Sequence, residues 1–148
     1  MAMKRSKEPW MPADDFGRSL RRGVGVNLLV ADMCAEVAFC RDCLGATVLY
    51  DDEDFAAIEL GGSVFMLHAD HSYGSHPLSG IVAGAETRGA GVEIRVYGLD
   101  PDTIEARARA RGDHLLSGSM DKPHGLRECH IVDPEGYVWA PSAAIPAQ

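Results

Sequence analysis

The stretch DKPHGLRECHIVDPEGYVWAPS, residues 121–142, alternates turn-forming and strand-forming sequence. Residues 122–125 (Lys-Pro-His-Gly) have turn chemistry, because proline presets one dihedral angle and glycine tolerates positive φ. Residues 126–132 alternate in side-chain character, as a strand does. Residues 133–139 supply a second turn (Asp-Pro-Glu-Gly) and then three strong strand formers (Tyr-Val-Trp). The stretch therefore predicts turn, strand, turn and strand, and Pro141 is expected to limit how far the last strand pairs.

The region before this stretch contains the same order of elements twice. In the first copy, residues 24–30 alternate as a strand, and Asp32 is a good N-cap for the helix that follows. Apolar residues recur at three-to-four spacing along that helix, which Gly45 ends. The apolar stripe of this helix consists of Met33, Val37, Cys40 and Leu44. Three strands are expected after the helix, at residues 47–50, 55–60 and 64–69.

The second copy begins with a strand at residues 92–97. Asp100 and Pro101 start a helix, which Gly112 stops, and strands are expected at 114–117, 126–132 and 137–140. Each copy is about 50 residues of β-α-β-β-β order, so the sequence contains an internal repeat. We predict an α+β fold in which two βαβββ modules form a curved mixed sheet around a cavity, closed within the chain or across a dimer.

The predicted organisation is an N-terminal arm and one domain. The arm covers residues 1–22, where aromatic residues such as Trp10 and Phe16 are expected to pack onto the body or onto a second subunit. The domain covers residues 23–148. It is divided into a first module at 23–70, a glycine-rich linker at 71–90 and a second module at 91–142.

The charge of the chain argues against nucleic acid as a partner. The net charge of the chain is −8. Residues 1–22 carry a charge of +3, so the remaining residues carry −11. An acidic body repels phosphates and attracts cationic ligands at low salt. No apolar run approaches the roughly 20 residues that cross a bilayer, and the charged N-terminus lacks the apolar core of a signal peptide. We therefore expect a cytoplasmic protein without membrane or nucleic-acid partners.

The cysteines point to reduced, packed thiols. Cys40 and Cys43 form a C-x-x-C, but they lie late in a predicted helix, whereas a redox pair needs the helix N-terminus to lower the thiol pKa. A structural zinc site would need a second pair at similar spacing, and the sequence has none.

The repeated β-α-β-β-β order resembles the vicinal oxygen chelate superfamily, which includes glyoxalase I, extradiol dioxygenases and bleomycin-resistance proteins. The matching pieces are NLLVADM leading into VAFCRDCLGA, VEIRVYGLDPD leading into EARARARG, and the 121–139 stretch. The resemblance covers about residues 23–142. It implies four metal-ligand positions in the metal-dependent members, because nitrogen and carboxylate donors from four strands hold a divalent ion with positions open to substrate.

Carried over to this sequence, those four positions hold Gly25, Met66, Glu93 and Ala140, with His68 an alternative to Met66. Glycine and alanine have no donor, and a thioether is a poor ligand for hard ions. The resemblance therefore implies the metal-free, bleomycin-resistance-like branch, whose members are dimeric binders of small molecules. We predict metal-independent binding of a small organic ligand by a homodimer, in a sequestration or resistance role, with no cofactor, metal or catalytic residue assigned.

The alternative is a metal-dependent lyase, isomerase or dioxygenase of the same fold. It would need a divalent metal held by a displaced set of ligands: His68, Glu93, Glu128 and His130.

Alternation along the strands predicts which side chains face the cavity. Arg95 is expected either to contact ligand or to pair structurally with Glu93 or Glu128 across neighbouring strands. His130 beside Glu128 is either a hydrogen-bonded wall residue or a proton-transfer pair. The predicted ligand-binding set is Asn27, Met66, His68, Glu93, Arg95, Tyr97, Glu128 and His130.

Overall fold

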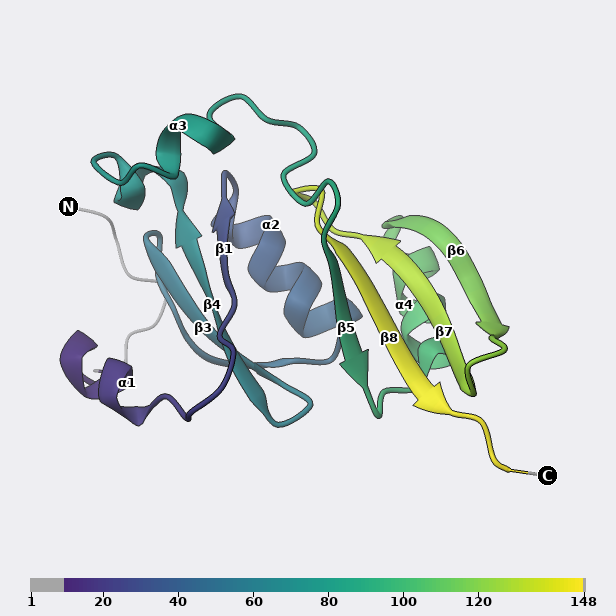
Figure 1. The fold of residues 1–148 in the computed structure, drawn as a ribbon. Coiled ribbons are helices and arrows are strands. Elements are labelled where there is room, and N and C mark those ends of the chain that lie inside the picture. The colour runs from purple at the N-terminus through teal and green to yellow at the C-terminus, as the bar shows by residue number, and fades with distance from the viewer. Residues whose placement is uncertain (1–9, 148) are drawn as a thin grey trace.

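The computed structural model describes residues 10–147, and it contains the two predicted modules (Figure 1). A short helix, α1 (Ala13–Ser19), precedes them. The first module consists of β1 (Asn27–Val30), α2 (Met33–Ala38), the π-helical segment η1 (Phe39–Cys43), β2 (Thr47–Asp51), β3 (Phe55–Leu60) and β4 (Ser63–Ala69). The linker contains η2 (Asp70–Tyr73) and α3 (Ser79–Val82). The second module consists of β5 (Glu93–Tyr97), α4 (Pro101–Arg111), β6 (His114–Asp121), β7 (Leu126–Val132) and β8 (Val138–Ala144).

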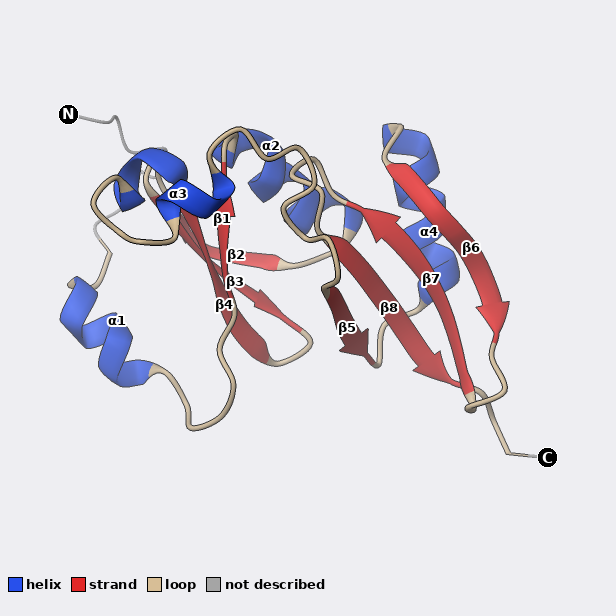
Figure 2. Ribbon diagram, turned by 45° about the horizontal axis from the view of Figure 1, so that its top comes forward, coloured by secondary structure: helices blue, strands red, loops and turns tan. Residues whose placement is uncertain are grey.

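Each module forms its own four-stranded sheet, and the two sheets have the same topology (Figure 2). Their strand orders are β1-β4-β3-β2 and β5-β8-β7-β6. The first strand of each module pairs in parallel with the last, and the other pairs are antiparallel. The α+β class with two βαβββ modules is thus confirmed. The curved surface consists of two separate sheets that are not closed.

The helix of the first module is buried on nearly every side. The predicted stripe of Met33, Val37, Cys40 and Leu44 is buried, but so are residues outside it, including Glu36 and Phe39. Two contacts with the second module account for this: α4 packs against η1 as well as against its own sheet, and Glu36 lies near Asp133 and Glu135 of the turn before β8. Buried residues of both modules consequently form one continuous hydrophobic cluster. An amphipathic pattern identifies the face toward one sheet and cannot reveal the second contact.

The strand registers separate two faces on each sheet. In the first sheet, Leu28 and Leu67 pair on the face that packs on the core, and their neighbours Asn27 and Met66 pair on the other face. In the second sheet, Trp139 and its partners lie in the core. We call the faces turned away from α2 and α4 the open faces.

Three strands differ from the sequence prediction by more than one residue at an end. β1 begins at Asn27, β6 continues to Asp121, and β8 continues through Pro141 to Ala144. The prediction that Pro141 limits the last strand is wrong. The strand continues through this proline even though β8 lies between β5 and β7, where a missing N–H costs more than at an edge. The antiparallel pairs nearest to Pro141 are Glu128 with Ser142 and Ile131 with Trp139, so regular pairing flanks the position that lacks an N–H.

Three of the four cysteines are packed, and Cys34 is exposed. Burial raises the pKa of Cys43 to about 12 and that of Cys129 to about 11, so both remain protonated thiols at neutral pH. In the part of the chain that the structure describes, no helix is long and apolar enough to cross a membrane.

The fully buried Glu36 predicts a specific pH dependence of stability. Neither carboxyl oxygen finds a hydrogen-bond donor among residues 10–147, and burial, followed by a side-chain hydrogen bond to Asp133 that only the protonated form can donate, raises its pKa well above the usual value. The folded state therefore holds a proton that the unfolded state releases above about pH 4.3. The stability that this proton contributes is complete below that pH and falls as pH rises toward the folded pKa.

Glu36→Gln should flatten this dependence. We expect the advantage of the variant over the wild type to grow between pH 5 and pH 8, with a slope of up to about 1.4 kcal/mol per pH unit. Urea unfolding at four pH values measures it. The exposed Glu53→Gln is the matched control and should stay within about 0.5 kcal/mol of wild type. A constant difference between Glu36→Gln and wild type across this range would show that Glu36 is ionised in the folded protein.

Candidate functional site

The open face of the second sheet carries a cluster of charged side chains around Arg95. Its guanidinium donates one hydrogen bond to Glu93 on the same strand and another to Glu128 on β7. His124, from the turn before β7, places Nε2 3.3 Å from the same Glu128 carboxylate. His130 places Nε2 3.4 Å from Glu93. We call these five residues the charged cluster.

Glu128 is ionised despite its burial. Only 4% of its side chain is exposed, and burial alone would raise its pKa. Hydrogen bonds from Arg95 and His124 outweigh that effect, so the net pKa is lowered. The hydrogen bonds that Arg95 makes with Glu128 and, to a smaller extent, with Glu93 raise the pKa of Arg95. The Arg95 guanidinium also lies 5.8 Å from the centre of the exposed Tyr97 ring.

The open face of the first sheet carries a hydrogen-bonded chain of neutral side chains. The Asn27 amide oxygen is 2.6 Å from Nδ1 of His68, and the Asn27 amide nitrogen donates to the Tyr73 hydroxyl at 2.7 Å. Burial lowers the pKa of His68, so this histidine is neutral at pH 7. Met66 pairs with Asn27 on the same face.

Aromatic rings from the N-terminal arm cover part of this face. Trp10 stacks on Tyr50 with ring centres 4.6 Å apart and planes 6° from parallel. Phe16 is buried and meets Phe55 edge to face at 5.6 Å. The described part of the arm, residues 10–22 with α1, thus packs on its own chain, beside the first sheet and away from the second (Figure 1). A groove of about 620 Å³ lies under it, and we call it the aromatic groove; its main lining residues are Trp10, Phe16, Tyr50, Phe55, Met66 and His68.

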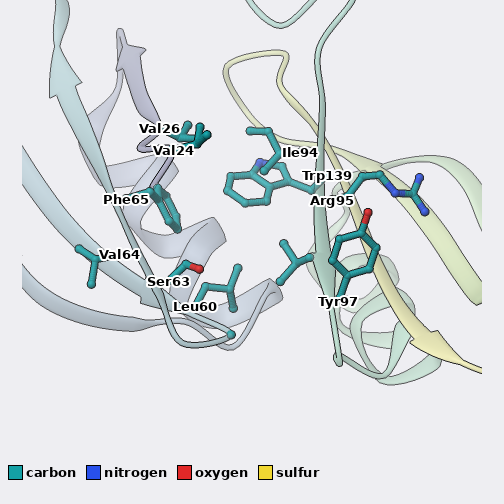
Figure 3. A pocket seen from close by; sticks show the side chains of 12 residues that line it. Val24, Val26, Leu60, Ser63, Val64, Phe65, Ile94, Arg95, Tyr97 and Trp139 are labelled. Carbon is teal, nitrogen blue, oxygen red and sulfur yellow. The ribbon is translucent and has the colours of Figure 1, made fainter. Parts of the chain in front are cut away.

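A smaller cleft of about 290 Å³ separates the two sheets (Figure 3). Val26 and Phe65 line it from the first module, and Ile94 and Trp139 line it from the second. The Arg95 side chain starts at its edge, but the guanidinium points away from the first module (Figure 3). The cleft therefore presents an apolar surface without an ionic group directed into it.

The four carried-over ligand positions do not fit a metal ion. Gly25 and Ala140 have no donor, Met66 offers a thioether, and Glu93 is bound by Arg95, whose positive charge opposes a cation at the same place. Among residues 10–147, no three His, Cys, Asp or Glu side chains lie close enough together to hold a metal. The displaced set is also divided within the chain, since His68 lies on the first sheet and its three proposed partners lie on the second.

The predicted ligand-binding residues thus fall into two groups. Asn27, Met66 and His68 lie on the open face of the first sheet, and Glu93, Arg95, Tyr97, Glu128 and His130 lie on that of the second. Sequence reasoning did not identify the aromatic groove as a site, although it noted that the arm would pack onto the body. A signal was present, because Tyr50 and Phe55 flank the acidic turn of one hairpin and the arm supplies two further aromatic residues outside the repeat.

Solved structures with this arrangement of elements support the resemblance. A glyoxalase/bleomycin resistance protein/dioxygenase from Nocardioides is 26% identical, with a TM-score of 0.63 over 91% of this chain and 95% of that chain. TioX from Micromonospora sp. ML1 is 24% identical, with a TM-score of 0.62 over 82% of this chain and 97% of the other. A lactoylglutathione lyase from Agrobacterium tumefaciens is 18% identical, with a TM-score of 0.62 over 83% and 94%.

No family model matches the sequence, and no curated protein matches it significantly. The molecule is thus a two-module α+β protein of the glyoxalase/bleomycin-resistance/dioxygenase fold. This is the fold that the resemblance of the sequence to the vicinal oxygen chelate superfamily predicts. Names in this group include both a resistance protein and a lyase, so the activity has to be argued from side chains.

The charged cluster predicts a large effect for Arg95→Met. This change leaves the buried Glu128 without its main partner, and we expect a loss of about 2–3 kcal/mol at pH 7. Because the folded pKa of Glu128 is lowered, the stability from this bond is present above its unfolded pKa and is lost as pH falls through the folded value. The deficit of Arg95→Met should therefore be full at pH 7 and shrink below about pH 4.

Arg127→Met is the matched control for this prediction. Arg127 also bridges two carboxylates, Asp102 and Asp121, but both are more than half exposed, so its removal should cost less than about 1 kcal/mol. Chemical unfolding of both variants at pH 7 and pH 3.5 measures the difference. Equal losses in the two variants at pH 7 would contradict a special role for the Glu128 contact.

Proposed function

We propose that this protein binds a small organic molecule on its open faces without a metal ion. The observation that carries the proposal is the position of Arg95, whose guanidinium bridges Glu93 and Glu128. The strongest oxygen donors of the second sheet are thereby committed to an internal cation. Binding then relies on stacking, apolar contact and hydrogen bonds, which are the usual features of a small-molecule site.

A sequestration or resistance role fits this chemistry better than Lewis-acid catalysis. Metal-assisted reactions in this fold need donors that converge on one ion, and here Gly25, Met66 and Ala140 supply none suited to hard ions. The −11 charge of the body favours cationic guests at low salt. The similarity to the glyoxalase/bleomycin resistance protein/dioxygenase from Nocardioides supports the same role.

We further propose that the protein is a homodimer located in the cytoplasm. Each open face is one wall of a site, and the two walls lie side by side in the chain and do not close on each other. Several apolar side chains remain exposed, among them Val24 at 99%, Tyr97 at 62% and Leu116 at 58%. A second copy that covers them would bury apolar surface and add an opposing wall to each site.

Three measurements on the purified full-length protein test the proposal. We expect elemental analysis to find well under one equivalent of zinc, nickel or iron, and dialysis against EDTA to leave the melting temperature unchanged. Light scattering should give a dimer, and native mass spectrometry should show an added small-molecule mass that mild denaturation releases. About one equivalent of a tightly held divalent ion, whose removal lowers the melting temperature, would overturn metal-independent binding.

A further inference from the structure

The aromatic groove has the size and lining of a site for a flat ring system. Its volume of about 620 Å³ lies within the range of small-molecule pockets. Trp10 is half-buried and is one of the lining residues; its ring stacks on Tyr50, and the centre of the Phe16 ring lies 5.1 Å away. Phe55 continues the wall, 5.9 Å from Trp10 and 5.0 Å from His68 between ring centres. Rings arranged in this way offer both stacking and edge-to-face contacts to a further aromatic ring.

One hydrogen-bond acceptor in this groove is left open by its neighbours. Since the Asn27 amide nitrogen donates to Tyr73, its amide oxygen faces His68 and accepts a hydrogen bond from the Nδ1–H group. The neutral imidazole then has its lone pair on Nε2. Within the described residues, the hydrogen bond of His68 is made through Nδ1 and none is made through Nε2, while the ring itself lines the groove. Asn27 and Tyr73 therefore fix His68 as an acceptor and not as a donor.

We propose that the ligand of the aromatic groove is a planar aromatic molecule with an N–H or O–H donor, which stacks against Trp10 and donates to Nε2 of His68. This inference rests on the proposed small-molecule function and narrows it to one chemical class. Trp10 lies in the arm, outside both modules, so the arm determines specificity here. An aliphatic guest would fill the same volume but would gain neither the ring contacts nor their orientation.

The acceptor should discriminate between otherwise equal ligands. A guest with a donor replaces the water that solvates Nε2 by a direct bond. A guest without a donor displaces that water and leaves the nitrogen unpaired, which lowers affinity by roughly tenfold or more. Met66 on the floor accommodates either guest, because its thioether packs favourably against aromatic rings.

Calorimetric titration with 2-naphthol and 2-methoxynaphthalene tests the proposal directly, since the two probes share a ring system and differ in the donor. We expect the wild type to bind 2-naphthol at least about tenfold more tightly. His68→Phe keeps a ring at this position without the acceptor and should remove the preference by weakening 2-naphthol alone. Trp10→Ala should weaken both probes about five- to tenfold, and Trp10→Phe should restore much of the loss.

His114→Phe is the matched control, because His114 is an exposed histidine at the start of β6 on the other sheet. It should leave both affinities unchanged, and unfolding curves verify that every variant is folded. Equal affinity of the wild type for the two probes, or unchanged binding in Trp10→Ala, would overturn the inference.

Native mass spectrometry of the same variants separates this failure from failure of the proposed function. If Trp10→Ala and His68→Phe retain the co-purifying small molecule at wild-type occupancy, the binding function stands and the aromatic groove is not its site. If no variant and no wild-type sample holds any small molecule, the binding function itself fails.

Discussion

The Glu135 carboxylate fixes the position of one module on the other. It accepts hydrogen bonds from the backbone N–H groups of Ala31 and Asp32, at 2.9 and 2.7 Å, where β1 turns into α2. Arg88, at the end of the linker, lies 3.6 Å from the same carboxylate and binds Asp70 through two nitrogens. The turn before β8, the start of α2 and both ends of the linker are therefore connected through the buried Glu135 carboxylate. The orientation of the two sheets, and with it the cleft between them, depends on this contact.

The same junction shows how this chain satisfies a concentration of buried acids. Asp133 accepts from two backbone N–H groups of its own turn and from the Trp139 indole, which links the turn to the core. Glu36 lies nearby without such donors, so it holds a proton, which it can donate to Asp133. Small residues complete the fit, because a side-chain carbon on Gly89 would lie 2.7 Å from the backbone of Tyr137. A junction this closely packed leaves little freedom for the modules to rotate toward each other.

Sequence predicted the features of this fold that are set locally. Turn chemistry located the loop that contains Asp133, and the caps of both helices follow from residues such as Asp100 and Gly45. Sequence failed where the decisive contact comes from elsewhere in the chain. Pro141 continues in β8 because strands on both sides hold it, and Glu36 is buried where α2 meets Asp133 and Glu135 of the turn before β8. Alternation placed the charged cluster on one face, but no periodic pattern relates Trp10 to the hairpin that it covers.

The division of chemistry between the two sheets restricts how a ligand can be held. The second sheet concentrates charge, but Arg95 satisfies its carboxylates internally, so only the outer parts of that cluster remain available to a guest. The first sheet has neutral donors and acceptors beside aromatic rings, and these interactions lose little strength in salt or on contact with an apolar ligand. Affinity should therefore arise mainly at the first sheet. Within one chain the two sheets lie side by side (Figure 1), so in the proposed homodimer the second sheet would reach the same ligand from the partner subunit.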